Sequence, residues 1–506
     1  MARAEVHGYC WPQSVVAGER VALHLSATPD GDGPRSVAVE VARVGWKREV
    51  VHTETLDVDH HPVPDAAAAN GCAWPAATEL TVGEWRNGYH EVLLSIDDGG
   101  KQRQSHAFFV VRPTEPTAPA LLALATNTLH AYNDFGGPNL YTGGTRVAMQ
   151  RPMARGYLHK PSGGSGRRVT TTVPPDPQME AHVGYVRLNH LSPYAGSAGW
   201  PDWEQPFLAW AEREGYAVDV CLNTDLEDHP EILDGYSLYL SVGHDEYWSA
   251  GMRDTVEAHV NRGGNAAFLS GNTSFWQVRL EERDDAGHAT VMVGYKGRFK
   301  DDPVWDTDRG VELTSMWSDH TIDRPENHMT GVSFARGGYH RIGKRATQGA
   351  GAYTIHRADH WLFDGTGLGY GDLLGAPSTI VGYECDGCDF TYRDGLPYPT
   401  HVDGTPETFV ILGTAPAAHF TRTTAARPPA PNEPSEVEFI ASRLFDSRDD
   451  ADVERIAYGH AVLGTWTSAA GGTVVTSGCT DWAHGLHGTD PQVEQVTRNI
   501  LDHLTT

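Results

Sequence analysis

The sequence predicts a β-sandwich through about residue 115, followed by one large α/β domain with a mostly parallel sheet over residues 116–506. Two observations indicate this class. Apolar and polar residues alternate with a period of two in the first part of the chain, whereas strand-like and helix-like segments alternate after Pro119. The Pro-rich stretch PTEPTAP between the two parts is typical of a linker.

The expected strands of the N-terminal domain, residues 1–115, are short and separated by turns. Val21, Leu23 and Leu25 alternate with polar residues in RVALHLSA, and SVAVEVARVG and HEVLLSID follow the same pattern. Turn residues collect in PDGDGP and in DDGG. We expect two packed sheets of the immunoglobulin-like kind, with a structural rather than a catalytic role.

Strands and helices alternate in the second domain. Buried strands are expected in PALLALATNT, YAVDVCL, YSLYLSVG and NAAFLSGN, and later in STIVGYE, ETFVILGTA and TVVTSG. Three segments have helical spacing: EQPFLAWAEREG, which stops at Gly215, MRDTVEAHVNRGG and QVEQVTRNILDHL. This alternation predicts a parallel sheet with helices on both faces, in the manner of flavodoxin and the glutamine amidotransferases.

The composition is that of an acidic globular protein. The 506 residues carry a formal net charge of −27, with 40 % hydrophobic and 21 % charged residues. Because phosphate binding needs clustered Lys and Arg, the charge argues against nucleic acid and anionic membranes as partners. No apolar run reaches the ~20 residues that span a bilayer, and no signal peptide is recognisable. Six cysteines form no disulfide framework, so we expect a cytoplasmic protein.

Polar side chains follow four of the expected strands. In open parallel sheets, ligands bind outside the carboxyl ends of the strands. We therefore expect one site at this edge of the sheet. The residues that follow the strands are Asn127, His130 and Tyr132, then His244, Asp245 and Glu246, then Ser270 and Asn272, and finally Glu384.

The turn after the strand YSLYLSVG carries no nucleophile. Enzymes of this sheet type often place a Cys or Ser there, but the turn reads Gly243-His244-Asp245-Glu246. Cys221 and Cys479 lack the small-residue elbow, so covalent catalysis is disfavoured. Glutamate and tyrosine oxygens suit a hard metal, whereas a network of hydrogen bonds without a metal fits the same spacing equally well.

Two other groups have metal-like patterns. The C-x-x-C in ECDGCD, residues 384–389, is half of a zinc motif, but no second ligand pair accompanies it. We expect two reduced cysteines in a turn. The HHP at residues 60–62 lies in a loop of the N-terminal domain, where we expect surface histidines.

Several separated motifs resemble the large (beta) subunit of N,N-dimethylformamidase. They are HAYNDFGGPNLY, GHDEYW, RGGNAAFLSGN and GYECDG, in that order along the chain. The N-terminal GYCWPQSVVAGERVALHLS is similar to the opening strands of that family. The resemblance thus touches both expected domains.

The resemblance implies an enzyme that hydrolyses an amide to a carboxylate and an amine with one ferric ion per chain, held by two tyrosine phenolates and one glutamate. Carried over to this sequence, the ligands are Tyr132 in HAYND, Tyr141 in PNLYTG and Glu246 in GHDEYW. The spacing between the two tyrosines is shorter here than in the family. The resemblance further implies four active-site partners: His244, Asn272, Lys296 in GYKG and Glu384.

The chemistry of these groups is consistent. Two phenolates and a carboxylate match a ferric ion, which would polarise the amide carbonyl and lower the pKa of a bound water. Glu384 or His244 would move the proton to the leaving amine. Asn272 and Lys296 would stabilise negative charge that develops on oxygen.

Two other functions remain open. The α/β domain can be a non-catalytic module that binds carbohydrate through its Trp residues, or a zinc-dependent hydrolase that uses His244 and Glu246.

The family enzyme has a longer large subunit and a separate small helical subunit. We expect a homo-oligomer, with a small partner subunit as a further option. The loops over residues 160–200 match nothing, so a small amide is expected as substrate without dimethylformamide being favoured.

Overall fold

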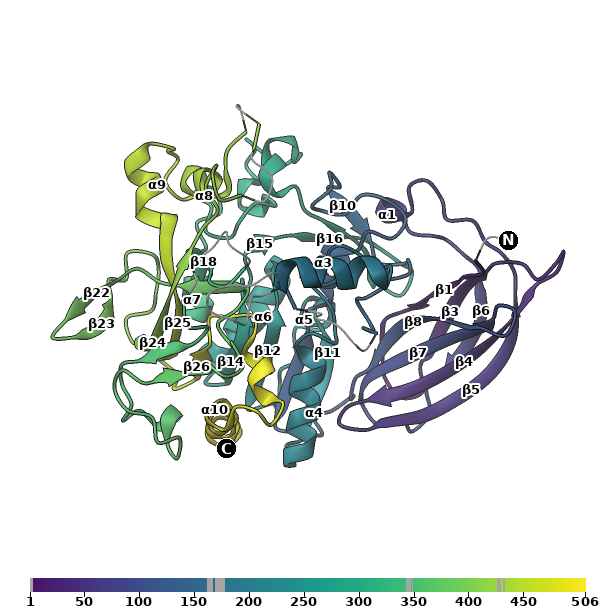
Figure 1. Cartoon of the computed structure of the whole chain (residues 1–506), viewed down its shortest axis with the longest axis horizontal. Coiled ribbons are helices and arrows are strands. Elements are labelled where there is room, and N and C mark those ends of the chain that lie inside the picture. The colour runs from purple at the N-terminus through teal and green to yellow at the C-terminus, as the bar shows by residue number, and fades with distance from the viewer. Residues whose placement is uncertain are drawn as a thin grey trace.

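The protein is described by a computed structural model. Its N-terminal strands form one end of an elongated molecule, and the remaining elements form the other end (Figure 1). The described residues are 3–161, 167–168, 178–342, 347, 349–425, 429–430 and 433–506.

The N-terminal strands form two sheets that enclose one hydrophobic core. One sheet has the order β2–β8–β7–β4–β5 and the other the order β1–β3–β6. Val21, Leu23 and Leu25 belong to the same buried cluster as Val39 and Val41, so the predicted alternation is confirmed. The strands are β1 (Val6–Trp11), β2 (Ser14–Val15), β3 (Arg20–Ala27), β4 (Arg35–Val44), β5 (Arg48–Val58), β6 (Ala76–Thr81), β7 (Gly88–Asp97) and β8 (Gln102–Val111).

The two ends of the molecule are joined by buried polar contacts. Asp219 accepts hydrogen bonds from Asn87 Nδ2 at 2.8 Å and from Thr117 N at 2.7 Å. Arg43 of β4 pairs with Glu212. These contacts do not test the division of the chain into residues 1–115 and 116–506, which stays a prediction, as does the immunoglobulin-like comparison.

A large mixed sheet forms the centre of the second part. Its main path has the order β11–β9–β12–β14–β26–β25–β24–β18–β21. The first five strands pair in parallel and the rest antiparallel. The strands are β9 (Ala120–Leu124), β11 (Val218–Leu222), β12 (Leu238–His244), β14 (Asn265–Gly271), β18 (Ser333–Tyr339), β21 (Glu384–Gly387), β24 (Val410–Ala418), β25 (Tyr458–Thr467) and β26 (Thr473–Thr476).

The prediction of a mostly parallel sheet is therefore wrong for the second half of the sheet. Parallel neighbours need a long crossover, whereas a short turn forces an antiparallel pair. Only residues 468–472 separate β25 from β26, and Gly471 and Gly472 lie in this turn. The topology shows a sheet-rich mixed fold, and the likeness to flavodoxin and the glutamine amidotransferases stays a prediction.

Helices cover both faces of the parallel strands. Leu122 and Leu240 belong to a core with α4 and α10, whereas the alternate residues Leu121 and Tyr239 pack with α5 and α6. The predicted helices are thus confirmed, and α4 ends at Gly215, whose φ is 90°. The helices are α4 (Glu204–Glu214), α5 (Asn223–Asp228), α6 (Ala250–Asn261) and α10 (Pro491–Leu504).

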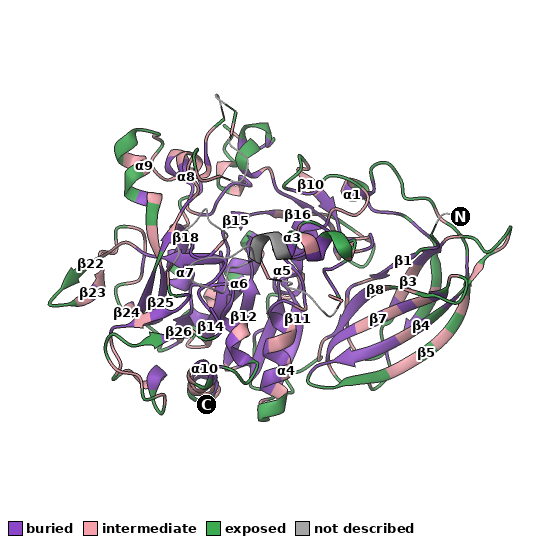
Figure 2. Ribbon diagram, in the orientation of Figure 1, coloured by how far each residue is buried: buried purple, intermediate pink, exposed green. Residues whose placement is uncertain are grey.

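The remaining elements surround this sheet, and exposed residues collect on outlying pieces such as the β22–β23 hairpin (Figure 2). No helix in the described ranges has the length and apolarity needed to cross a membrane. The other helices are α1 (Ala67–Asn70), α2 (Thr126–Tyr132), α3 (Gln178–Leu188), α7 (Asn327–Thr330), α8 (Glu436–Leu444) and α9 (Asp450–Ala457). The other strands are β10 (Arg146–Ala148), β13 (Tyr247–Trp248), β15 (Trp276–Gln277), β16 (Arg279–Arg283), β17 (Ala289–Val293), β19 (Tyr353–Ile355), β20 (Leu373–Leu374), β22 (Phe390–Arg393) and β23 (Leu396–Pro399).

Candidate active site

His244 and Glu246 lie where β12 leaves the sheet. Gly243 has a φ of 86°, and a Cβ atom there would lie 2.4 Å from Cβ of Trp203. Only glycine fits this bend without strain. Beyond it, the backbone N–H of Glu246 donates to Thr128 Oγ1 at 2.9 Å. The strand end therefore presents both side chains in fixed positions.

Three side-chain oxygen groups meet beside this strand end. The Tyr132 hydroxyl donates to the Tyr141 hydroxyl at 2.7 Å, and the Tyr141 hydroxyl donates to Glu246 Oε1 at 2.7 Å. Trp276 Nε1 donates to the same carboxylate oxygen at 2.7 Å. Tyr132 and Glu246 are buried; Tyr141 is 40 % exposed, but its hydroxyl end lies between them. The two phenols and the carboxylate thus converge on one point, as predicted.

This cluster suits a hard cation. Burial raises the pKa of Tyr132, of Tyr141 and of Glu246, because each charged form loses water. A cation held among the oxygens would reverse this effect by favouring the phenolate and carboxylate forms. Oxygen donors of this kind are those that hard metal ions prefer. The donor set therefore fits the ion that the family resemblance implies.

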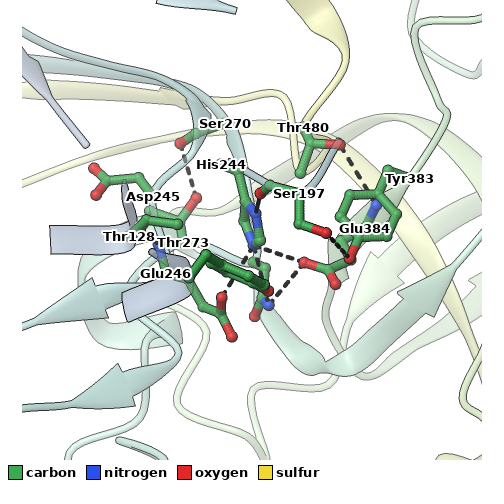
Figure 3. A network of polar contacts seen from close by, with 12 residues as sticks. Thr128, Ser197, His244, Asp245, Glu246, Ser270, Thr273, Tyr383, Glu384 and Thr480 are labelled. Carbon is green, nitrogen blue, oxygen red and sulfur yellow. Dashed lines mark hydrogen bonds and ion pairs between the residues drawn. The ribbon is translucent and has the colours of Figure 1, made fainter. Parts of the chain in front are cut away.

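His244 bridges the oxygen cluster and a second carboxylate (Figure 3). Its Nε2 lies 2.7 Å from Glu384 Oε2 and 3.4 Å from Glu246 Oε2, and its Nδ1 lies 2.6 Å from the carbonyl oxygen of Ser197. Burial opposes the charged ring, but the Glu384 carboxylate outweighs it and raises the pKa of His244 to about 9. The ring therefore carries a proton on both nitrogens in this arrangement.

Asn272 completes the group of His244 and Glu384. Its Nδ2 donates to Glu384 Oε2 at 2.9 Å, and its backbone N–H donates to Asp386 Oδ1 at 2.8 Å. Asn272 has a φ of 51°, which asparagine tolerates better than most residues. A Cβ atom on the preceding Gly271 would lie 2.6 Å from the carbonyl oxygen of Glu384. The ends of β14 and β21 thus meet backbone to backbone at this point.

Lys296 also reaches the cluster, from the first position of a 3₁₀ helix (Lys296–Asp301). Its Nζ donates to the Tyr247 hydroxyl at 2.7 Å and lies 3.2 Å from the centroid of the Tyr141 ring. Burial lowers the pKa of Lys296 to about 7, against the opposing charges of Glu246 and Glu384. The structure therefore brings all seven predicted site residues together, with Lys296 against the phenol rings.

Two predictions about strand ends are wrong. Glu384 does not follow a strand from Thr379; it begins the antiparallel strand β21. Gly375 and Pro377 place residues 375–380 in a turn, because proline lacks an N–H for the ladder. His130 lies outside the site, and its Nε2 is 3.0 Å from Gln13 Oε1 in the N-terminal part.

A cavity of about 310 Å³ opens onto the cluster. Tyr132, Tyr141, Glu246, Asn272 and Glu384 form its polar side. A larger cavity of about 530 Å³ lies elsewhere, near His106 and Arg155, but the site chemistry belongs to the smaller one. The other residues that line the cavity of about 310 Å³ are mainly aromatic: Tyr194, Phe275, Trp276, Phe334, Tyr339, Tyr383, Phe420 and Phe439, with Arg168, Ile342, Glu436 and Ile440.

Neither these aromatic residues nor Arg168 is among the site residues predicted from the sequence. Phe275 and Trp276 lie shortly after Asn272, beyond Thr273 and Ser274, so the segment after the strand NAAFLSGN contained a usable signal. Tyr383 precedes Glu384 in the same way. Arg168 lies in the loop region over residues 160–200, which resembled nothing. The others come from distant segments and carry no local pattern.

The side chains with the spacing of metal ligands lie away from His244 and Glu246, the pair expected for a zinc site. Among the described residues, the His, Cys, Asp and Glu side chains that cluster within 4.8 Å of one another are Glu91 and His106 of the N-terminal strands and His159 of the second part. Glu384 lies 2.7 Å from His244 Nε2, but in the described ranges His244 and Glu246 belong to no group of three such ligands that all lie within 4.8 Å of one another. The C-x-x-C cysteines are both free and buried, but Cys385 lies in β21 and not in the expected turn.

A family comparison and a curated relative both point to the N,N-dimethylformamidase beta subunit. The family described as "N,N-dimethylformamidase beta subunit-like, C-terminal" matches residues 38–496. The N,N-dimethylformamidase beta subunit of an Alcaligenes species is 24 % identical over 331 residues, which cover 57 % of this chain and 42 % of the relative. The chain thus matches less than half the length of this curated relative.

The solved structures that resemble this chain do not help to assign its family or fold. A DNA glycosylase of Pseudomonas fluorescens, AlkC bound to abasic-site DNA, is 17 % identical over 22 % of this chain and 31 % of its own, with a TM-score of 0.15. A lytic polysaccharide monooxygenase of Streptomyces lividans is 16 % identical over 20 % of this chain and 59 % of its own, with a TM-score of 0.13. Likenesses this weak carry no argument. Because the family match spans most of the sequence, the chain belongs to the N,N-dimethylformamidase beta subunit-like family.

Proposed function

We propose that this protein hydrolyses the C–N bond of a small N-substituted amide with one ferric ion per chain, held by Tyr132, Tyr141 and Glu246. The observation that carries the proposal is the convergence of these three oxygen groups, through contacts of 2.7 Å, at the wall of an aromatic cavity. The family membership supports a hydrolase of the dimethylformamidase kind. The ion and the reaction are our proposal.

The side chains of the site have separate roles in the proposed reaction. A ferric ion, when bound, would polarise the amide carbonyl and lower the pKa of water. Glu384 Oε2 is the base that takes a proton from the attacking water, because His244 and Asn272 hold it toward the cavity. His244 Nε2 then gives a proton to the leaving nitrogen. The products are a carboxylate and an amine, and proton transfer of this kind contributes about 10²–10⁴ in rate.

The two other functions have less support. Among the 14 Trp residues, all of which are described, Trp46 alone is exposed, at 53 %, so there is no row of indole faces for a sugar. A zinc site on His244 and Glu246 would need a third ligand such as Glu384, but among the described residues these side chains form no group whose ligand atoms all lie within 4.8 Å of one another. The relative is named a beta subunit, and we propose that this chain, too, assembles with further chains.

Metal content and colour test the proposed ligands first. We expect one iron per chain and a broad visible absorption band, because light promotes electrons from phenolate oxygen to ferric iron. Tyr132→Phe removes one oxygen and keeps the ring, so the band should weaken or vanish while the fold persists. Elemental analysis and absorption spectra measure both.

The matched control for this test is Tyr194→Phe. The Tyr194 ring lies 6.1 Å from the Tyr132 ring and lines the same cavity, so this variant should keep the band. A colourless protein that contains iron would contradict the two tyrosine ligands. Stoichiometric zinc would favour the zinc hydrolase, and a metal-free protein the binding module.

Asn272 variants test the second group of residues. Removing its amide should leave metal and colour intact and slow turnover by about 10²-fold, the effect of losing one donor to a developing negative charge. Because the φ of Asn272 is 51°, Asn272→Ala adds backbone strain, whereas Asn272→Gly does not. Both variants should be equally slow in kcat. If Asn272→Gly turns over like the wild type, the side-chain amide has no role.

A further inference from the structure

Arg168 is a half-buried cation in the wall of the active-site cavity. Its Nη1 contacts the Ser197 hydroxyl and lies 3.4 Å from the Tyr383 hydroxyl, and its guanidinium carbon is 5.6 Å from the centroid of the Tyr383 ring. Tyr383 in turn lies 5.8 Å from His244, ring to ring. Arg168 is therefore one aromatic ring away from the proposed reaction centre.

The charge of Arg168 has no ion-pair partner in the part of the chain that the structure describes. Among the described residues, no carboxylate oxygen lies within the 4.0 Å of a salt bridge, and Nε has no hydrogen-bond acceptor. The adjacent Arg167 differs, because it pairs with Asp481 at 3.5 Å and donates to the carbonyl oxygens of Ser378 and Thr379. Arginine stays protonated in proteins. A charge that is half withdrawn from water without a carboxylate partner is unfavourable. Its position in a cavity wall therefore points to an anionic ligand that would pair with it.

Much of the remaining cavity wall is aromatic, and Glu436 lines it as well. Phe275, Phe334, Tyr339 and Phe420 form a chain of touching rings with centroid separations of 5.2, 5.4 and 4.2 Å. Phe439 lies 5.9 Å from the Trp276 ring. The volume of about 310 Å³ reaches the range of roughly 300–1,000 Å³ that holds drug-sized ligands. This is far more room than a dimethylamide needs.

We propose that the substrate is an amide that carries both an aryl-sized apolar group and a carboxylate, and that Arg168 binds this carboxylate. The guanidinium supplies two parallel N–H donors to a planar carboxylate, the arrangement for which arginine is suited. The aromatic wall holds the apolar group, and the amide lies toward Glu246 and Glu384. This inference rests on the proposed amide hydrolysis, whereas the anion site itself can be tested without turnover.

Binding is the first test. Hydrocinnamate and its neutral amide, hydrocinnamamide, differ only in the carboxylate, and calorimetry on the protein with its native metal gives both Kd values. The wild type should prefer hydrocinnamate by about 10- to 100-fold, the range for hydrogen bonds to a charged group. Arg168→Gln should lose this preference, and Arg168→Lys should keep part of it. Arg155→Gln removes the same charge at an exposed position and should bind as the wild type does.

Equal affinity of the wild type for the two probes would overturn the proposal. So would an unchanged preference in Arg168→Gln, because the carboxylate would then bind elsewhere, for example on the metal. Thermal unfolding of each variant must match the wild type, and Arg168→Lys serves as the charge-conserving variant if Arg168→Gln is unstable.

Turnover separates the substrate class from the proposed reaction. N-formylphenylalanine should have a kcat/KM about 10- to 100-fold above that of its neutral C-terminal amide, and Arg168→Gln should level the two by slowing only the first. Rapid cleavage of neutral formamides without this preference would support the hydrolase and overturn the substrate class. Arg168-dependent binding with cleavage of neither compound would overturn the hydrolase and keep the anion site.

Discussion

Glu246→Gln is expected to give a folded protein that has lost both its metal and its activity. The carboxylate accepts hydrogen bonds from Tyr141 and Trp276 at 2.7 Å each, and a glutamine of the same shape can still accept them through its carbonyl oxygen. It cannot supply the negative charge that a ferric ion requires, and a neutral amide oxygen is a poorer ligand. The loss therefore concerns the metal and not the packing.

Metal content, amide turnover and thermal unfolding of Glu246→Gln decide this expectation. Glu326→Gln is the matched control, because Glu326 is also fully buried and burial raises its pKa to about 8, so the change removes no charge at neutral pH. It does not line the active-site cavity and should keep metal and activity. Full activity in Glu246→Gln would exclude Glu246 as a ligand.

Breaking the buried ion pair of Asp319 and Arg443 should have the largest effect on stability. Arg443 lies near the end of α8, and its Nε and Nη2 donate to the two carboxylate oxygens of Asp319 at 2.6 and 2.8 Å. Both side chains are almost fully buried. Asp319→Ala leaves the arginine charge without its partner in the interior, which costs about 3–5 kcal/mol of the free energy of unfolding.

Urea titration measures this loss, and a second pair on the same helix provides the control. Arg422 pairs with Glu438 at 2.8 Å, but its side chain is 42 % exposed. Arg422→Ala should therefore cost at most about 1 kcal/mol. The double variant Asp319→Leu/Arg443→Met should recover much of the loss, since it leaves no buried charge. Equal costs for Asp319→Ala and Arg422→Ala would contradict the expectation.

The residues that sequence reasoning located best are those next to regular strands. His244, Glu246 and Asn272 follow β12 and β14, whose apolar runs are continuous, because these strands are buried on both faces. The rule for ligand sites at strand ends then placed them correctly. Tyr141 lies in a loop and Lys296 begins a short 3₁₀ helix, and only the family resemblance located them.

The antiparallel strand at Glu384, the aromatic cavity wall and Arg168 could not be predicted from the sequence, because they depend on contacts between distant segments. Nothing near Thr379 shows that STIVGYE turns before Glu384 and pairs antiparallel with β18. The aromatic wall is assembled from residues as far apart as Phe275 and Phe439, and each of them is an ordinary apolar residue in its own segment. Arg168 stands among Gly, Ser and Pro residues without a periodic pattern.

The close approach of β14 and β21 at Gly271 has a consequence for how the protein becomes active and how it fails. Asn272 and Glu384 are distant in sequence, and they meet only after the parallel and the antiparallel halves of the sheet have joined. Contacts between distant segments form late in folding, since a long loop must close first. A newly made chain thus assembles the proposed catalytic group at one of the last steps of folding. On mild heating, separation of the two halves would abolish the proposed activity while most of the helices and strands persist.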